Sequence, residues 1–322
     1  MNIFVTGGGG FVGRTLLAKL IDAGHSATAM LLEGESTEGL EPAAKIVRAD
    51  ITRPASLRGV MDNHDAVVHL AGAVGYGQQW SRCVEVNVNG TRNIAEEAVR
   101  AGVRRFVHMS SVSVYGRLPE VALTEDAALI KTDDPYGDTK IDAENVVRQI
   151  GGGGALKWTI LRPTVIYGAG DDKFLPKLVQ NLRSGSARII GSGTASVDLV
   201  HVDDVVTFIE ALLSDERSHG EVLNLADPDT CTWQELLGVV ADELGVPRPS
   251  KRLPYHVALV VAGAMELVAR VTGRPPRLTR YAVRVVGRQY RYVATRAREL
   301  GFSSSVPLER GIVGVMRLST SG

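Results

Sequence analysis

Residues 3–13 read IFVTGGGGFVG and decide the fold. A short apolar run leads directly into four glycines, and apolar residues at helical spacing follow as far as residue 23. In this position the glycines at 7, 10 and 13 allow a tight turn, a close approach of backbone to a pyrophosphate, and close contact between helix and strand. The stretch therefore predicts a strand–turn–helix unit that binds a dinucleotide, with a purely structural glycine turn as the alternative.

The same rhythm continues along the first half of the chain. We expect strands at 3–6, 27–32, 45–49, 66–70, 105–109 and 158–161, and helices at 11–23, 55–62, 82–101 and 136–149. Short strands alternating with helices predict an α/β fold, a doubly wound parallel sheet of the Rossmann type. We expect a dinucleotide-binding domain over 1–167, to which 202–226 also contribute, and a smaller, mostly helical substrate lobe over 168–322.

Composition narrows the function. The chain has 322 residues, 44% of them hydrophobic, and 36 basic against 36 acidic side chains. Disorder is excluded, and no overall positive field indicates a nucleic-acid partner. Two cysteines, Cys83 and Cys231, form no disulfide framework, and neither a signal peptide nor a run of ~20 apolar residues is visible, so we expect a soluble, cytoplasmic protein. No His/Cys spacing indicates a metal site.

A carboxylate for the adenosine ribose is expected about 20 residues beyond the glycines. Glu33 stands there, and no basic residue directly follows Leu31 and Leu32, so the sequence favours NAD over NADP. A solvated loop glutamate is the alternative. Asp50, after the third strand, is a candidate acceptor for the adenine amino group or a helix cap.

Two further patterns carry polar chemistry. Asp134 and Pro135 predict a helix start, and Tyr136 and Lys140 then lie four residues apart on one face of that helix. The ammonium favours the phenolate form of a tyrosine and makes it a workable acid or base near neutral pH. The second pattern, SSVSVYG at 110–116, follows a strand and puts hydroxyls at the carboxyl edge of the sheet, unless it is an ordinary serine-rich turn.

Several motifs occur in a fixed order. They are the glycine triplet, Leu70-Ala71-Gly72, NVNGT at 87–91, SSVSVYG at 110–116, Tyr136 with Lys140, Leu161-Arg162-Pro163 and HVDD at 201–204. Together they resemble the extended short-chain dehydrogenase/reductase family. The resemblance implies a catalytic triad in which Tyr136 shuttles a proton, Ser111 hydrogen-bonds the substrate oxygen, and Lys140 holds the nicotinamide ribose and keeps the tyrosine acidic.

The resemblance also implies binding residues, with NAD as the cofactor and a small molecule as the substrate. The expected NAD contacts are Gly7, Gly10, Phe11, Val12, Gly13, Glu33, Asp50, Ile51, Leu70, Ala71, Gly72, Asn87, Pro163 and Val165. The expected substrate contacts are Val74, Ser113, His201 and Arg277, although His201 also suits a role in bracing the lobe. A homodimer through the helices at 82–101 and 136–149 is implied as well.

The residues after the expected catalytic serine exclude one reaction. Sugar-nucleotide dehydratases of the family carry an Asp-Glu pair where this chain has Val112 and Ser113. Segments 253–255, 275–281 and 298–302 resemble the 3β-hydroxysteroid and sterol-carboxylate dehydrogenase branch. We therefore expect interconversion of a secondary alcohol and a ketone on an apolar ring substrate. A nucleotide-sugar 4-epimerase is the first alternative, and a non-catalytic dinucleotide sensor is the second.

The C-terminal third carries two more patterns. In the helix expected at 255–271 an apolar stripe, Val257, Val260/Val261, Ala264, Leu267/Val268 and Val271, predicts lobe core, with a membrane surface as the alternative partner. Nine arginines and no acidic residue lie between 270 and 298, and those from 277 to 291 fall at helical spacing. A solvated face, a clamp for a diphosphate and an anionic-lipid contact remain open for them.

Overall fold

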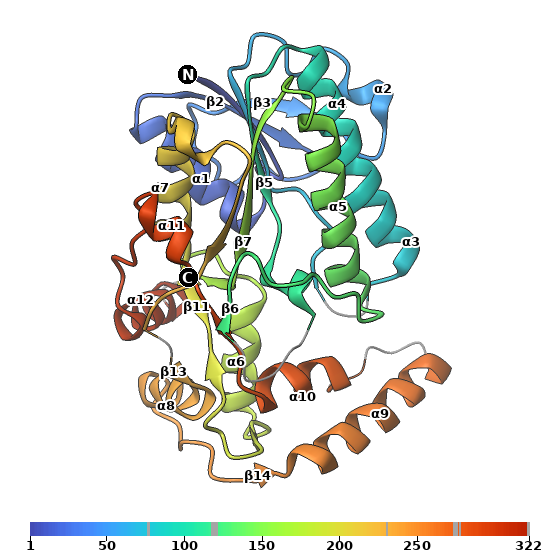
Figure 1. Ribbon diagram of the computed structural model, residues 1–322. Coiled ribbons are helices and arrows are strands. Elements are labelled where there is room, and N and C mark those ends of the chain that lie inside the picture. Colours follow the sequence, from blue (N-terminus) through green and yellow to red (C-terminus); the bar gives the residue numbers. More distant parts are fainter. Residues whose placement is uncertain (76–77, 117–121, 230, 273–275, 277, 321–322) are drawn as a thin grey trace.

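A computed structural model gives the structure of residues 1–75, 78–116, 122–229, 231–272, 276 and 278–320 (Figure 1). Seven parallel strands form the main sheet: β1 (Asn2–Thr6), β2 (Ser26–Leu31), β3 (Lys45–Arg48), β4 (Ala66–His69), β5 (Arg105–Met109), β7 (Lys157–Pro163) and β12 (Glu221–Leu225). Their order is β12-β7-β5-β4-β1-β2-β3. The doubly wound fold is confirmed, and the strand order reverses between β1 and β4, where such sheets bind their ligands.

Helices cover both faces of the sheet (Figure 1). One face packs against α1 (Phe11–Asp22) and α7 (Val202–Leu212), and the other against α2 (Pro54–Leu57), α4 (Thr91–Arg100) and α5 (Pro135–Gly151). Helix α1 packs on the sheet through its apolar face, where Leu16, Leu17 and Leu20 are fully buried against the strands. The helix expected at 55–62 is shorter than predicted and ends at Leu57.

The helix expected at 82–101 contains a local irregularity. It runs as α3 (Trp80–Cys83), a π-helical segment η1 (Val84–Gly90) and then α4. Gly90 permits close packing there, because a Cβ at this position would lie 2.6 Å from Ile51 Cδ1. The wider turn is of the kind found at functional sites, and it carries Asn87.

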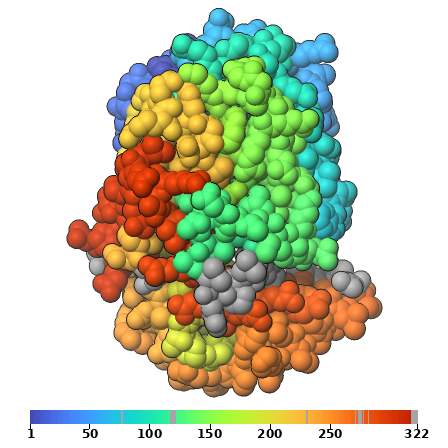
Figure 2. Space-filling view, viewed as in Figure 1, coloured from blue at the N-terminus to red at the C-terminus, as the bar shows by residue number. Residues whose placement is uncertain are grey.

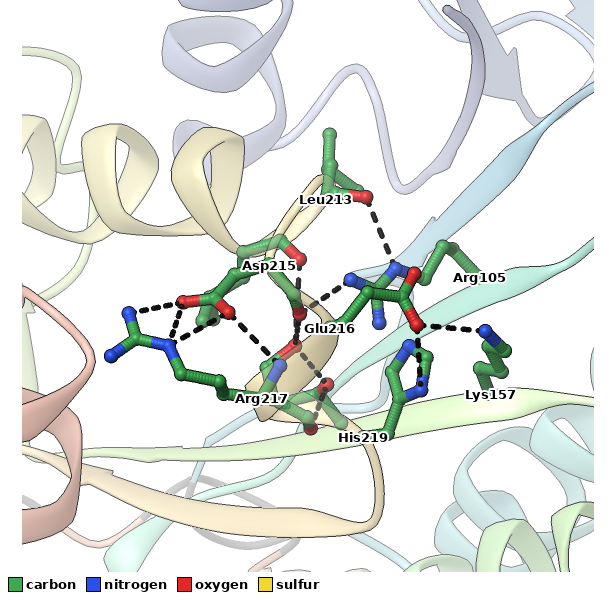
Figure 3. A network of polar contacts seen from close by, with 10 residues as sticks. Arg105, Lys157, Leu213, Asp215, Glu216, Arg217 and His219 are labelled. Atoms are coloured by element: carbon green, nitrogen blue, oxygen red, sulfur yellow. Dashed lines mark hydrogen bonds and ion pairs between the residues drawn. The ribbon is translucent and has the colours of Figure 1, made fainter.

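At the amino ends of the strands a polar network fixes the connection between α7 and β12 (Figure 3). Arg105, at the start of β5, donates to the carbonyl oxygens of Leu213 and Asp215. Lys157, at the start of β7, pairs with Glu216 at 2.8 Å. Since ligands bind at the carboxyl ends of such strands, this network is structural and lies at the edge opposite the site.

Most of the remaining elements lie beyond the carboxyl ends of the sheet strands, in the region expected to form the lobe (Figure 1). Its helices are α6 (Phe174–Arg183), α8 (Trp233–Glu243), α9 (Tyr255–Thr272), α10 (Arg280–Gly287) and α12 (Leu308–Thr320), and short strand pairs join them. By contrast, α11 (Thr295–Glu299) packs against β12 and belongs to the core of the main sheet. The extended segment 196–201 is not one continuous strand. It breaks at Asp198 into β10 (Ser196–Val197), which pairs with β13 (Cys231–Thr232), and β11 (Leu199–His201), which pairs with β8 (Val165–Tyr167).

The apolar stripe of α9 is not lobe core, so that prediction is wrong. Val260, Leu267 and Val271 are 73%, 63% and 83% exposed, whereas Ala258 and Ala262 on the other side are fully buried. The reason is that α9 packs on α10 through these small residues, and Figure 2 shows α9 at the lower rim of the molecule. No helix in the described ranges is long and apolar enough to cross a membrane.

The arginine-rich segment is not one helical stripe either. Of the described arginines, Arg280 and Arg284 lie on α10, Arg288 follows it in extended backbone, and Arg291 is on the short strand β15 (Arg291–Tyr292). Arg280 pairs with Glu266, and Arg296 of α11 pairs with Asp126. The first alternative, solvent-exposed arginines that pair with acidic residues, therefore holds for Arg280 and Arg296.

Candidate cofactor and catalytic site

The glycine-rich turn and the end of β4 form one cradle at the switch point. Gly7 has a φ of +68°, and a Cβ there would lie 2.9 Å from the backbone nitrogen of Ala71. A Cβ on Gly13 would lie 2.2 Å from the Gly7 carbonyl oxygen. Only glycine allows these approaches, and the first turn of α1 leaves its amides open, since no side chain caps it at Gly10. These residues fit a dinucleotide pyrophosphate.

Lys140 lies beside this cradle. Its Nζ donates to the carbonyl oxygen of Met109 at the end of β5, at 2.8 Å, and its side chain is 3% exposed. Burial lowers the Lys140 pKa to about 8. The same Nζ lies 6.0 Å from the centroid of the Tyr136 ring and 3.3 Å from where a Cβ on Gly72 would stand. The structure therefore brings Tyr136, Lys140 and Gly72 together.

Local sequence fixes the two segments that carry the candidate catalytic residues. Asp134 caps α5 by accepting from the Gly137 amide at 3.2 Å, and Pro135 is in the first turn, so this predicted helix start is confirmed. Ser111 caps the 3₁₀ turn η2 (Val112–Tyr115), with its Oγ accepting from the Ser113 amide at 3.2 Å. This bond leaves the Ser111 hydroxyl hydrogen to be donated to another acceptor.

Asn87 links the end of β4 to α5. Its Oδ1 accepts from the Ala73 amide at 2.8 Å, and its Nδ2 donates to Thr139 Oγ1 at 3.0 Å. Beneath it His69, on β4, lies between two threonine hydroxyls, with Nδ1 2.7 Å from Thr6 Oγ1 and Nε2 2.9 Å from Thr91 Oγ1. This network fixes the backbone between β4 and α5. Sequence reasoning missed His69, because a histidine within an apolar strand resembles core.

A second buried network ties α5 to β7. Arg162 of β7, 1% exposed, forms two hydrogen bonds with Glu144, from Nε at 2.8 Å and from Nη2 at 2.7 Å. Ser110 Oγ donates to the same carboxylate at 2.6 Å. The pair outweighs the burial that would raise the Glu144 pKa, and that pKa is lowered. Glu144 stands one turn after Lys140, so the network positions the helix that carries Tyr136 and Lys140. The Leu-Arg-Pro motif was its only signal in the sequence.

The other expected contacts are spread along the same edge. Asp50 accepts from both the amide and the hydroxyl of Thr52, so it closes a local turn and does not cap α2, whose N-cap is Arg53. The Ile51 side chain is buried against Gly90. Val74 is 43% exposed. Phe11, Val12, Leu70, Val165 and Ser113 are half-buried, and Pro163 ends β7.

The structure does not place the other three expected contact residues beside the glycine turn or Lys140. His201 is buried against the Tyr167 ring and beneath Gly311, and its Nδ1 accepts from the Asp203 amide, which is the bracing role. Glu33 is exposed in the loop after β2, whereas Glu35 lies against the glycine turn. Arg277 lies outside the described residues.

Comparison with known proteins decides the family. Residues 3–226 match the NAD dependent epimerase/dehydratase family. The chain belongs to that family. It is accordingly an NAD-dependent oxidoreductase, and the glycine cradle beside Lys140 is where its residues fit NAD. A sensor without turnover is set aside.

Individual relatives point in two directions. The 2-alkyl-3-oxoalkanoate reductase of Stenotrophomonas maltophilia is 28% identical, over 97% of both chains. The 3 beta-hydroxysteroid dehydrogenase/Delta 5-->4-isomerase of Mycobacterium tuberculosis is 30% identical, over 94% of this chain and 85% of that one. Among solved structures, the UDP-glucose 4-epimerase of Thermotoga maritima has a TM-score of 0.80 at 23% identity, covering 99% and 100% of the two chains, which shows the shared fold.

Proposed function

We propose that the protein interconverts a secondary alcohol and a ketone on a small apolar ring substrate, with Ser111, Tyr136 and Lys140 as the catalytic residues. The observation that carries the proposal is the buried Lys140 ammonium, 6.0 Å from the Tyr136 ring centroid and against Gly72 at the switch point. A charge is costly to bury, and here it is placed where it acts on a phenol beside a nucleotide cradle.

Each residue has a separate task in this proposal. When bound, NAD supplies the acceptor or donor of the hydride at its nicotinamide. The Lys140 charge favours the phenolate of Tyr136, which then takes the proton of the substrate hydroxyl, or gives one to the ketone oxygen in the reverse direction. The Ser111 hydroxyl donates to the same substrate oxygen and orients it. Gly7, Gly10 and Gly13 hold the pyrophosphate, and Pro163 and Val165 border the nicotinamide.

Apolar side chains near this edge support an apolar substrate. Val74 is 43% exposed after β4, and Val112 and Val165 are half-buried after β5 and β7. Relatives over nearly the whole chain are named for hydroxysteroid and oxoalkanoate substrates, which agrees with that lining.

The test is NADH fluorescence after purified protein and NAD⁺ are mixed with a panel of hydroxysteroids and a panel of nucleotide sugars. Accumulation of NADH with a ring alcohol supports the proposal. No NADH, together with inverted sugar stereochemistry in the same tubes, would replace it with a nucleotide-sugar 4-epimerase. That second candidate is favoured by Arg284 and Arg288, exposed arginines with no ion pair in the described ranges, which could hold a diphosphate.

The proposal also includes two surfaces through which the protein contacts larger partners: a second copy of itself and a lipid surface. Trp80 and Val84, 46% and 38% exposed and one turn apart, support self-association through α3 and its neighbours, tested by light scattering of wild type against Trp80→Ser. The exposed stripe of α9 supports a weak contact with a lipid surface, tested by co-sedimentation with anionic vesicles. Monomers in the first test, or no sedimentation in the second, would remove the corresponding contact.

A further inference from the structure

The carboxylate that lies against the glycine turn is Glu35, and not Glu33, which its distance from the glycines along the sequence predicts. Gly9 leaves room for Glu35, because a Cβ on Gly9 would lie 2.6 Å from Glu35 Oε1. The other oxygen, Oε2, accepts from the Leu32 amide at 2.9 Å, which fixes the side chain beside the turn. Glu33, two residues earlier, is exposed and makes no side-chain hydrogen bond or ion pair within the described ranges.

Two arginines donate to backbone carbonyl oxygens of the glycine turn and of the loop that carries Glu35. Arg14, in the first turn of α1, donates from Nε to the Gly9 carbonyl oxygen at 2.8 Å. Arg48, at the end of β3, donates to the carbonyl oxygens of Leu32 and Glu35, both at 2.6 Å. Neither guanidinium has a carboxylate within 4.0 Å in the described part of the chain. Both charges thus remain available to an anion at this place.

We propose that Glu35, and not Glu33, is the carboxylate that selects NAD over NADP, and that Arg14 and Arg48 would hold a 2′-phosphate if Glu35 lost its charge. A carboxylate beside the glycine turn accepts hydrogen bonds from ribose hydroxyls and repels a phosphate, whereas guanidinium groups are the usual phosphate partners. The proposal concerns the cofactor alone and does not depend on which substrate is used.

Binding of NADH and of NADPH, each titrated into purified protein by calorimetry, tests this without any substrate. Wild type should bind NADH at least about tenfold more tightly than NADPH. Glu35→Gln should tighten NADPH by about tenfold and weaken NADH severalfold. The matched control Glu33→Gln removes the same charge from the same loop and should leave the ratio unchanged within about twofold.

Two further variants close the argument. Glu35→Asp keeps the charge, so it should still bind NADPH more weakly than NADH. It provides the test of the carboxylate if thermal unfolding shows that Glu35→Gln is misfolded. Arg48→Met in the Glu35→Gln background should remove the gained NADPH affinity. The proposal is overturned if Glu35→Gln leaves the ratio unchanged, if Glu33→Gln shifts it, or if wild type binds both nucleotides equally or binds neither. If wild type selects NADH but turns over no substrate, that result counts against the proposed catalytic function and leaves the assignment of Glu35 intact.

Discussion

Lys140 Nζ lies 6.0 Å from the centroid of the Tyr136 ring, one turn further along α5 and held by the Met109 carbonyl oxygen. In the proposed mechanism, this relationship makes the charge of Lys140 a condition for the proton transfer by Tyr136. It depends on β5, β4 and α5 meeting at one edge of the sheet.

The pH dependence of turnover follows from that relationship. Because the Lys140 pKa is lowered to about 8, its ammonium loses its charge as the pH rises through that value, and the phenolate of Tyr136 is then no longer favoured. We expect kcat/KM to fall on the alkaline side with an apparent pKa near 8. In Lys140→Met, kcat/KM should be lower by about a hundredfold, and its pH profile should lack this alkaline decrease. A wild-type profile flat to pH 10 would contradict the assignment.

The Arg162–Glu144 pair should be critical for folding. Arg162→Met leaves a carboxylate buried with fewer partners and should lower the free energy of unfolding by about 3–5 kcal/mol. Urea denaturation measures this. The double variant Arg162→Met, Glu144→Met removes both charges and should recover part of the loss. Equal destabilisation by both variants would mean that packing, and not charge, is what the pair supplies.

Acid should unfold the protein through two histidines. Burial lowers the His69 pKa to about 3 and the His108 pKa well below its usual value, with the Lys140 charge adding to both effects. A histidine kept neutral by folding contributes stability that is complete above about pH 6.5 and is lost as the pH falls toward the folded pKa. For His69 this loss is about 2 kcal/mol at pH 5.

Urea unfolding of wild type and His108→Leu at pH 7.5 and pH 5 tests this. Both ring nitrogens of His108 are buried with no hydrogen-bond partner in the described residues, so leucine should cost nothing at pH 7.5 and should remove part of the acid loss. Identical wild-type stability at the two pH values would refute the account of these histidines.

A methyl group in the glycine cradle should weaken NAD binding. On Gly13 it would lie 2.2 Å from the Gly7 carbonyl oxygen, so Gly13→Ala must displace the turn or the helix. Calorimetry should show NADH affinity reduced by at least about tenfold. Gly153→Ala, where the added carbon meets nothing within 4 Å, should bind as wild type does. Unchanged binding by Gly13→Ala would place the pyrophosphate elsewhere.

Local patterns predicted the parts of this structure that local physics determines. The strand–glycine–helix stretch at 3–13 and the cap at Asp134 were correct because backbone sterics and a side-chain hydrogen bond act within a few residues. The stripe of α9 was not, since an apolar periodicity says that a helix has an apolar face but not what covers it. His69, Arg162 and Glu35 also needed the fold, because their partners lie far away in the chain or across a turn.

The most direct measurement of the central claim is a comparison of wild type and Tyr136→Phe, each assayed for NADH formation with the ring alcohol that wild type oxidises and titrated with NADH. Loss of the phenol oxygen should lower kcat by a factor of about 10²–10⁴ while leaving NADH affinity within about twofold of wild type. Full turnover by Tyr136→Phe would contradict the claim that this tyrosine carries the proton.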